Sequence, residues 1–296
     1  MMEVRYYIGS FTDINKIFIS YEEKEFLEKN SNYLMNLSTL SIFYYNTIRN
    51  LDKLIEYLAQ KRNLNSLNDY DRKNVFADYN LHLSNTVASF YSLIEFIESM
   101  YSSTNILSRI YDKHFEYRLF YEFRKIITHE GLIVKNSRTQ FNQDSLVVSA
   151  IIKKEDIINS KKCNKKFKKE LEQGETKEFD LFVLCGNFKK VLEDLLENLI
   201  SNEKQNIINS FTTMTNYMKK VGDKNEDCFM LKNDEPIWSL VKVTNMFLER
   251  YYFNFLNGIN SHELVKESTT VKSLFIQLSF IYFGTPGAIP KFVREF

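Results

Sequence analysis

Turn-forming residues are scarce in this sequence, which has only 8 Gly and 3 Pro among 296 residues. Sandwiches and barrels of many short strands need frequent turns, and dinucleotide-binding folds need a glycine-rich loop, so the scarcity disfavours both. Hydrophobic residues make up 44% of the chain and charged residues 26%, which is ordinary globular usage and argues against wholesale disorder. The sequence therefore predicts a mostly helical protein with a substantial hydrophobic core.

Apolar residues recur at three- and four-residue steps in the N-terminal half, which is the period of an amphipathic helix. The pattern predicts three long helices, over residues 21–61, 71–101 and 106–130. Gly131 stands where the third helix needs a C-terminal cap. Long helices joined by short turns are expected to pack as an antiparallel bundle. The opening residues 4–19 alternate weakly and fit either a short strand or a leading helix.

The pattern changes after Gly131, where short apolar runs replace the helical period. Residues 132–134 and 145–152 flank a polar stretch and predict a small β-hairpin. Helical periodicity then returns over roughly residues 155–172, 178–220, 236–258 and 262–283. Pro236 is expected in the first turn of the third of these helices. We therefore predict an all-α chain in two parts, a bundle with a hairpin over 1–155 and a helical region of unknown role over 156–296.

The balance of charges and the number of cysteines disfavour several classes of protein. The chain has 39 Lys+Arg against 38 Asp+Glu, whereas a protein that coats nucleic acid through bulk charge is far more basic, so nucleic-acid contact would have to be local. Three widely spaced cysteines form neither a disulfide framework nor a zinc pair. The N-terminus has no apolar run, and the most apolar stretch, residues 274–283, is too short to span a bilayer. We expect a cytoplasmic protein with no membrane partner and no metal.

One short motif carries most of the functional argument. Arg124 and His129, at the end of the third predicted helix, form an R-x4-H pattern. The pattern resembles the signature of the HEPN superfamily (higher eukaryote and prokaryote nucleotide-binding), whose members are helical bundles and often metal-independent ribonucleases. The resemblance covers roughly residues 20–155. Family members usually carry Asn, Asp or His directly after the arginine, where this chain has Lys125, so the lysine either contacts phosphate or marks an altered site.

The resemblance implies a homodimeric endoribonuclease of the toxin–antitoxin, abortive-infection or antiviral-defence kind, with a catalytic site shared between protomers. An imidazole titrates near neutral pH and can move the protons of the 2′-OH and the leaving oxygen. A guanidinium donates two parallel hydrogen bonds to phosphate as charge builds. Such a site needs no cofactor, leaves a 2′,3′-cyclic phosphate and spares DNA. RNA would be the substrate, and an antitoxin or a phage-derived trigger a further partner.

The helical spacing bears on how the motif could work. Five steps place His129 roughly 140° around the helix from Arg124 and about 7.5 Å along it, so the two side chains do not converge in a straight helix. Two geometries would bring them together. Either the helix ends near Thr128 and His129 swings back, or a dimer brings two motifs into one cleft.

Other charged residues are weaker candidates. Arg118 lies about 120° around the helix from Arg124 and could contact phosphate. Residues 161–169 hold six lysines in nine positions. Four of them are RNA-binding candidates: Lys161, Lys162, Lys165 and Lys166. The simpler interpretation of this run is a solvated helix face with Phe167 turned inward, and Glu122 and Glu130 are interpreted as solvated acids pairing with a nearby base.

Two rival functions stay open at this stage. The same bundle could be a non-catalytic interaction or sensor module that binds a phage protein or a toxin partner. It could also be a nucleotide-binding HEPN domain that depends on a separate nucleotidyltransferase. The remaining histidines, His82, His114 and His262, are interpreted as hydrogen-bonded structural residues.

Overall fold

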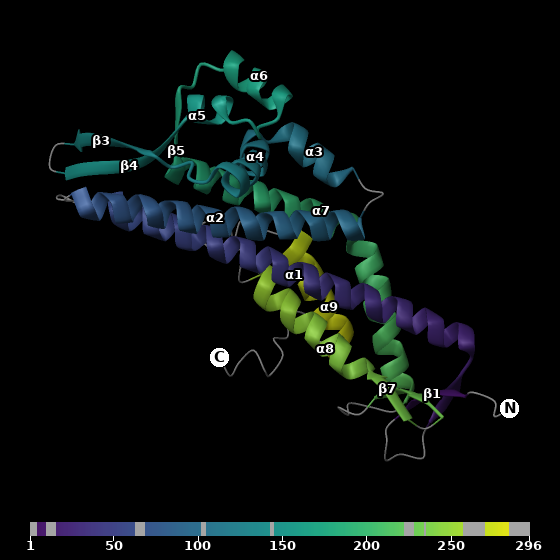
Figure 1. Cartoon of the computed structure of the whole chain (residues 1–296). Coiled ribbons are helices and arrows are strands. Elements are labelled where there is room, and N and C mark those ends of the chain that lie inside the picture. The colour runs from purple at the N-terminus through teal and green to yellow at the C-terminus, as the bar shows by residue number, and fades with distance from the viewer. Residues whose placement is uncertain are drawn as a thin grey trace. The chain divides into compact units, whose positions relative to one another are not determined.

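The computed structural model describes most of the chain and divides it into two compact units. The described residues are 5–9, 16–62, 69–101, 105–142, 145–221, 228–233, 235–256 and 270–283. One unit comprises residues 1–42 and 197–296, and the other comprises residues 43–196. Two long helices, α1 (Tyr21–Arg62) and α7 (Leu181–Lys220), contribute residues to both units. The described chain is mainly helical with two small antiparallel sheets (Figure 1), which confirms the mainly α prediction.

The unit of residues 43–196 is built around helices that pack through aromatic side chains. Its helices besides α1 and α7 are α2 (Asp69–Met100), α3 (Ile106–Lys113), α4 (Phe115–Glu130), α5 (Lys154–Asn159) and α6 (Lys165–Gln173). Phe120 of α4 stacks on Phe188 of α7 with ring centroids 3.8 Å apart, and Phe90 of α2 meets Phe188 edge-on at 4.9 Å. All three rings are buried, and each contributes about 1.5–3 kcal/mol by leaving water. These contacts fix α4, which carries the R-x4-H motif.

The third predicted helix is wrong in one respect, because it is two helices with a break at His114. That residue is extended, with φ −115° and ψ 117°. The guanidinium of Arg118 donates to the carbonyls of Tyr111 at 2.6 Å and Asp112 at 3.0 Å. It thereby satisfies carbonyl groups that the end of α3 leaves without helical partners. The predicted cap is confirmed, since Gly131 has φ +89° and its N–H donates to the carbonyl of Ile127 at 3.3 Å.

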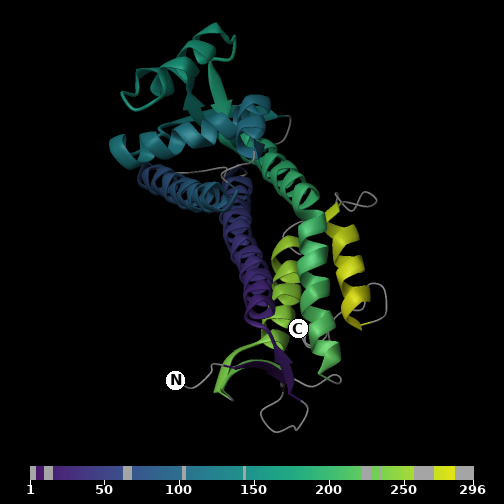
Figure 2. The ribbon, with the colours of Figure 1, turned by 90° about the vertical axis from the view of Figure 1, so that its right-hand side faces the viewer.

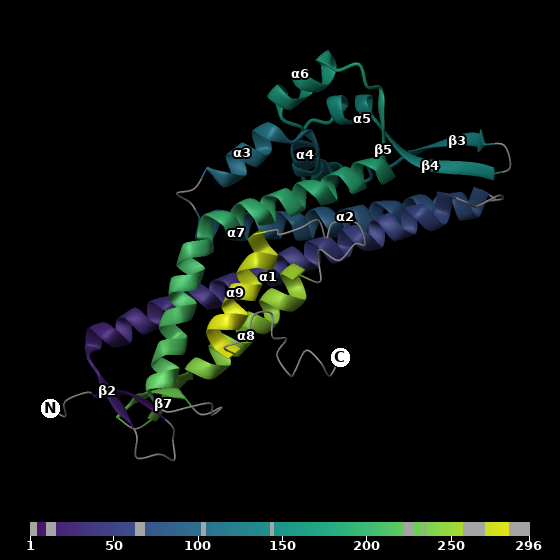
Figure 3. The ribbon, with the colours of Figure 1, turned by 180° about the vertical axis from the view of Figure 1, so that it is seen from behind.

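The predicted hairpin exists, but its first strand is displaced. The strands are β3 (Asn136–Asn142), β4 (Ser145–Lys153) and β5 (Glu178–Asp180), in the order β3-β4-β5, and the hairpin of β3 and β4 extends beyond β5 (Figure 3). Residues 132–134 are no strand, because the amide of Asn80 on α2 takes the place of a strand partner. Its Oδ1 accepts the N–H groups of Ile133 and Val134, both at 3.0 Å, and its Nδ2 donates to the Val134 carbonyl at 2.8 Å.

The helix expected over 155–172 is also divided. It forms α5 and α6, and residues 160–164 between them are not helical. The side chain of Asn164 caps α6 by accepting the N–H of Lys166 at 2.8 Å. A helix was expected over residues 178–220. Its first three residues form strand β5 instead, and the helix α7 begins at Leu181.

The other unit combines a small sheet with a helical layer. Its strands are β1 (Tyr6–Gly9), β2 (Ile17–Ile19), β6 (Phe229–Lys232) and β7 (Glu235–Ser239), in the antiparallel order β2-β1-β6-β7. The described parts of the opening stretch therefore contain two strands, β1 and β2, and no leading helix. Pro236 lies in β7 and not in a helix, and it is tolerated because β7 is an edge strand, where a missing N–H disrupts no inner ladder.

The helical layer of this unit is formed by α7 together with α8 (Leu240–Arg250), the π-helical turn η1 (Tyr251–Leu256) and α9 (Thr270–Phe283). Figure 2 shows α8 and α9 beside the C-terminal part of α7. Phe211, Phe247 and Tyr251 are buried among these elements. Residues 262–269 of the last predicted helix lie outside the described residues. No helix in the described ranges is both long and apolar enough to cross a membrane.

Candidate functional site

The site candidates lie along one stripe of α4. Positions 121, 124, 125, 128 and 129 follow the spacing that places helical residues on a common face. Tyr121, Arg124 and Lys125 are half-buried there, whereas Thr128 and His129 are exposed. The opposite face supplies the core residues Leu119, Phe120, Phe123 and Ile126. The helix therefore buries one side against the bundle and presents the motif on the other.

Arg124 stands at the edge of the stripe that faces α2. Its guanidinium carbon lies 3.0 Å from the ring centroid of Tyr91, which is a cation–π arrangement. A hydrogen bond with Glu95 is the main cause that raises the pKa of the Tyr91 phenol, and the positive charge of Arg124 opposes it. The guanidinium is thus oriented by an aromatic ring while remaining half-buried at the surface of this unit.

His129 stands at the other edge of the stripe, in the last turn of α4. Its side chain is exposed, and among the described residues no group hydrogen-bonds, pairs or stacks with it. Because α4 continues to Glu130, where the third predicted helix was expected to end, the first of the two geometries is not formed, and His129 does not swing back toward Arg124. Within one chain the two side chains keep the divergence of roughly 140° that five helical steps produce.

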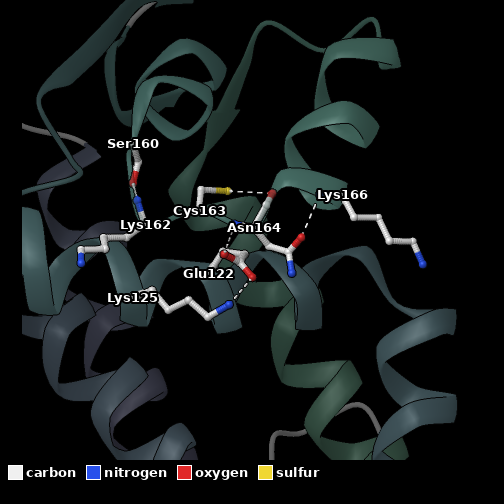
Figure 4. Close-up of polar contacts among 7 residues, drawn as sticks. All are labelled: Glu122, Lys125, Ser160, Lys162, Cys163, Asn164 and Lys166. Carbon is white, nitrogen blue, oxygen red and sulfur yellow. Dashed lines mark hydrogen bonds and ion pairs between the residues drawn. The ribbon is translucent and has the colours of Figure 1, made fainter.

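Glu122 anchors the non-helical residues 160–164, which we name the anchor segment, to α4 (Figure 4). Its side chain is 1% exposed, so the expectation of a solvated acid is wrong for this residue. Lys125 donates to Oε1 at 2.7 Å, and the backbone N–H of Asn164 donates to Oε2 at 2.9 Å. The pairing with a nearby lysine is confirmed, and the carboxylate is buried because the anchor segment covers it.

Glu130 forms a second attachment of the same segment. Its Oε1 accepts the hydroxyl of Ser160 at 3.0 Å and the N–H of Lys162 at 3.2 Å. The ammonium of Lys168 donates to the carbonyl of Ser160 at 2.5 Å. Between the two attachments, burial raises the pKa of the Cys163 thiol to about 12, and the Glu122 charge adds to the shift. The thiol is therefore an unreactive, buried group.

The two attachments place an exposed lysine cluster beside the motif helix. We name Lys161 and Lys162 of the anchor segment, together with Lys165 and Lys166 of α6, the α6 lysines; all four are exposed. Across the described ranges, no carboxylate forms an ion pair with any of them. Phe167 is buried and stacks on Phe115 at 5.8 Å, so the expected solvated face with an inward phenylalanine is confirmed. These ammonium groups make the local positive surface that net charge alone does not reveal.

Arg118 does not belong to this surface. Besides the two carbonyls at the end of α3, it binds the carboxylate of Glu170 on α6 at 2.6 Å. The guanidinium is therefore engaged in joining α3, α4 and α6, and its contact with phosphate stays a prediction. In the parts of the chain that the structure describes, no group of three or more His, Cys, Asp and Glu gathers as metal ligands would.

The sequence pattern identified Arg124 and His129 but missed their neighbours. Tyr121 lies three residues before Arg124, and a helical projection would have placed it on the same face. Tyr91 and Ser160 lie more than thirty positions away in the chain and left no local signal. No family model, curated protein or solved structure matches this chain.

Proposed function

We propose that this chain is a metal-independent endoribonuclease that acts as a homodimer, of the kind used in toxin–antitoxin and antiviral-defence systems. The observation that carries the proposal is the stripe of α4, on which a guanidinium and an exposed imidazole stand beside the α6 lysines. Glu122 and Glu130 tie the lysine-bearing segment to the same helix. A proton-transfer group, an oriented cation and a backbone-binding surface are the parts that RNA cleavage requires.

In the proposed reaction the 2′-oxygen attacks the adjacent phosphorus and expels the 5′-oxygen. His129 moves the protons, since an imidazole titrates near neutral pH and this one is accessible to substrate. Arg124 donates hydrogen bonds to the phosphate oxygens as their charge increases. The products are a 2′,3′-cyclic phosphate and a 5′-hydroxyl, and DNA is not cleaved because it lacks the nucleophile.

The geometry of the motif supports the homodimer part of the proposal. A single α4 directs Arg124 toward Tyr91 and His129 away from it, so one chain does not place both groups on one phosphate. A second copy related by a two-fold axis would supply the missing group from its own stripe. The exposed position of His129 leaves room for that approach.

The Arg124–Tyr91 contact also favours a second candidate, the non-catalytic interaction module. A guanidinium engaged by a ring can serve packing alone, and α4 would then present a recognition surface without chemistry. The two candidates differ in whether removal of the exposed imidazole changes any reaction.

The test is incubation of the purified chain with total cellular RNA in EDTA. The wild type should cleave RNA and leave cyclic-phosphate ends, and His129→Ala should not. Lys190→Ala, an exposed change on α7, is the matched control and should cleave like the wild type. Absence of cleavage by a folded, dimeric wild type, or cleavage by His129→Ala at the wild-type rate, would overturn the proposal in favour of the interaction module.

A further inference from the structure

Three tyrosines from three helices form a continuous row beside the motif. Tyr121 of α4 lies between Tyr111 of α3 and Tyr91 of α2, with ring centroids 6.2 Å and 6.5 Å from its own. All three side chains are half-buried, so each ring is partly accessible. We name these three residues the tyrosine row. Core aromatics of the same unit, such as Phe120 and Phe123, are by contrast fully buried.

Each ring of the row has its own cation. The distances to the ring centroids are 5.9 Å for Arg118 over Tyr111, 4.7 Å for Lys125 over Tyr121 and 3.0 Å for Arg124 over Tyr91. Two of these cations are paired with carboxylates, Arg118 with Glu170 and Lys125 with Glu122. Arg124 has no ion pair within the described ranges. The row thus combines partly exposed aromatic rings with neighbouring cations, of which Arg124 belongs to the R-x4-H motif.

The row is connected to the α6 lysines by consecutive contacts. Lys125 lies over Tyr121 and donates to Glu122, which accepts the N–H of Asn164, the residue that caps α6. Lys165 and Lys166 follow directly and are exposed. Partly exposed aromatic rings and exposed lysines therefore lie next to each other in one unit of the chain.

We propose that the tyrosine row binds single-stranded RNA by stacking its bases, while the α6 lysines hold its phosphate backbone. The proposal rests on the proposed ribonuclease function, since it names the form of RNA that the site takes. Aromatic side chains beside a positive surface are the usual means of binding single strands, because every unpaired base offers a π-face. A duplex hides those faces, and an acidic peptide would use the lysines without the rings.

The test is fluorescence anisotropy with a labelled 2′-O-methyl RNA of about 12 nucleotides, within the usual range of single-strand site sizes. This probe lacks the free 2′-OH, so binding is measured without cleavage. Tyr121→Leu removes the ring but keeps apolar volume, and it should weaken binding about 5- to 150-fold. Tyr121→Phe is the matched control and should bind within about twofold of the wild type, because it keeps the stacking surface.

A second pair of variants tests the backbone contact without disturbing packing. The double variant Lys165→Ala/Lys166→Ala should weaken binding and reduce the slope of log Kd against log salt by about 1 for each lysine that contacts phosphate. Lys190→Ala should leave that slope unchanged. If Tyr121→Leu does not fold, this pair and a comparison of the wild type on single strand and duplex decide the matter.

Three results would overturn the inference. They are equal affinity for the single strand and its duplex, wild-type affinity in folded Tyr121→Leu, and displacement of the probe by polyglutamate as readily as by unlabelled RNA. Failure of the inference differs from failure of the proposed function. Tyrosine-dependent binding without cleavage of natural RNA overturns only the nuclease, whereas cleavage with no effect of Tyr121→Leu on probe binding overturns only the tyrosine row.

Discussion

Substitution of Lys125 distinguishes a structural lysine from a catalytic one. This residue directly follows Arg124 of the R-x4-H motif. In the structure its ammonium lies 2.7 Å from Oε1 of Glu122. The Glu122 side chain is 1% exposed, and the Lys125 side chain is 29% exposed. Lys125→Ala therefore leaves a buried carboxylate with the N–H of Asn164 but without its cation.

The magnitude follows from that burial. Removing one partner of a fully buried ion pair costs about 3–5 kcal/mol. Here the lysine is partly solvated, which weakens the pair, and the Asn164 hydrogen bond at 2.9 Å remains. We therefore expect Lys125→Ala to destabilise this unit by roughly 1–3 kcal/mol. The corresponding fall in Tm is on the order of 2–10 °C for a domain of this size.

The assay is thermal unfolding followed by circular dichroism, combined with amide hydrogen exchange at Asn164. A chain of two compact units need not unfold in one transition. Hydrogen exchange at the Asn164 amide is therefore needed, because it measures the opening of the anchor segment itself. The matched control is Lys190→Ala, which removes an exposed lysine from α7. The double variant Lys125→Ala/Glu122→Gln should recover part of the loss, because glutamine keeps an acceptor for Asn164 and removes the unpaired charge.

Two results would refute this reasoning. One is a Lys125→Ala protein with wild-type unfolding and wild-type exchange at Asn164. The other is a double variant whose loss equals the sum of the two single losses, which would show that Lys125 and Glu122 are not coupled. If RNA cleavage also fell in the first case, Lys125 would be a phosphate contact.

Three further predictions follow from the structure. Asn80→Ala should cost about 2–4 kcal/mol and accelerate exchange of the Ile133 amide, because buried N–H groups lose their acceptor. Burial raises the pKa of Glu193, so the folded chain keeps a proton that the unfolded chain releases, and stability falls as pH rises above the ordinary carboxyl range. Glu193→Gln should therefore raise Tm at about pH 8 and have little effect near pH 4. An equal mixture of Arg124→Ala and His129→Ala chains, in which about half of the dimers are mixed, should regain RNA cleavage that neither variant shows alone. An inactive mixture that still exchanges subunits would contradict the shared site.

Helical periodicity predicted α1, α2 and α7 well, because each buries a long continuous stripe. The breaks at His114 and within residues 160–164 could not be found this way. No glycine or proline marks either one, and tertiary hydrogen bonds form them instead, from Arg118 to the end of α3 and from the anchor segment to Glu122 and Glu130. The small number of Gly and Pro residues correctly predicted a mainly helical chain. For the same reason, no such residue marked where these helices end.

Only the part of the site that lies within α4 could be predicted from the sequence. Arg124 and His129 lie in one segment, so a spacing rule finds both and also shows that they diverge. The ring that orients Arg124 comes from α2, and the hydroxyl bound by Glu130 comes from residue 160. Neither neighbour has a spacing relation to the motif, so only the packed structure shows them.

The local charge of the site illustrates why composition alone misleads. A net charge of +1 argues against a nucleic-acid-binding surface if charges are evenly distributed. In this unit, however, Glu122 and Glu130 point at backbone N–H groups and Glu170 binds Arg118. Those carboxylates are engaged within the fold, while the α6 lysines remain exposed. A nearly neutral chain thus forms a basic surface because these three carboxylates are engaged by other groups of the fold and none of them forms an ion pair with the α6 lysines. The surface lies beside the exposed imidazole that we propose to be catalytic.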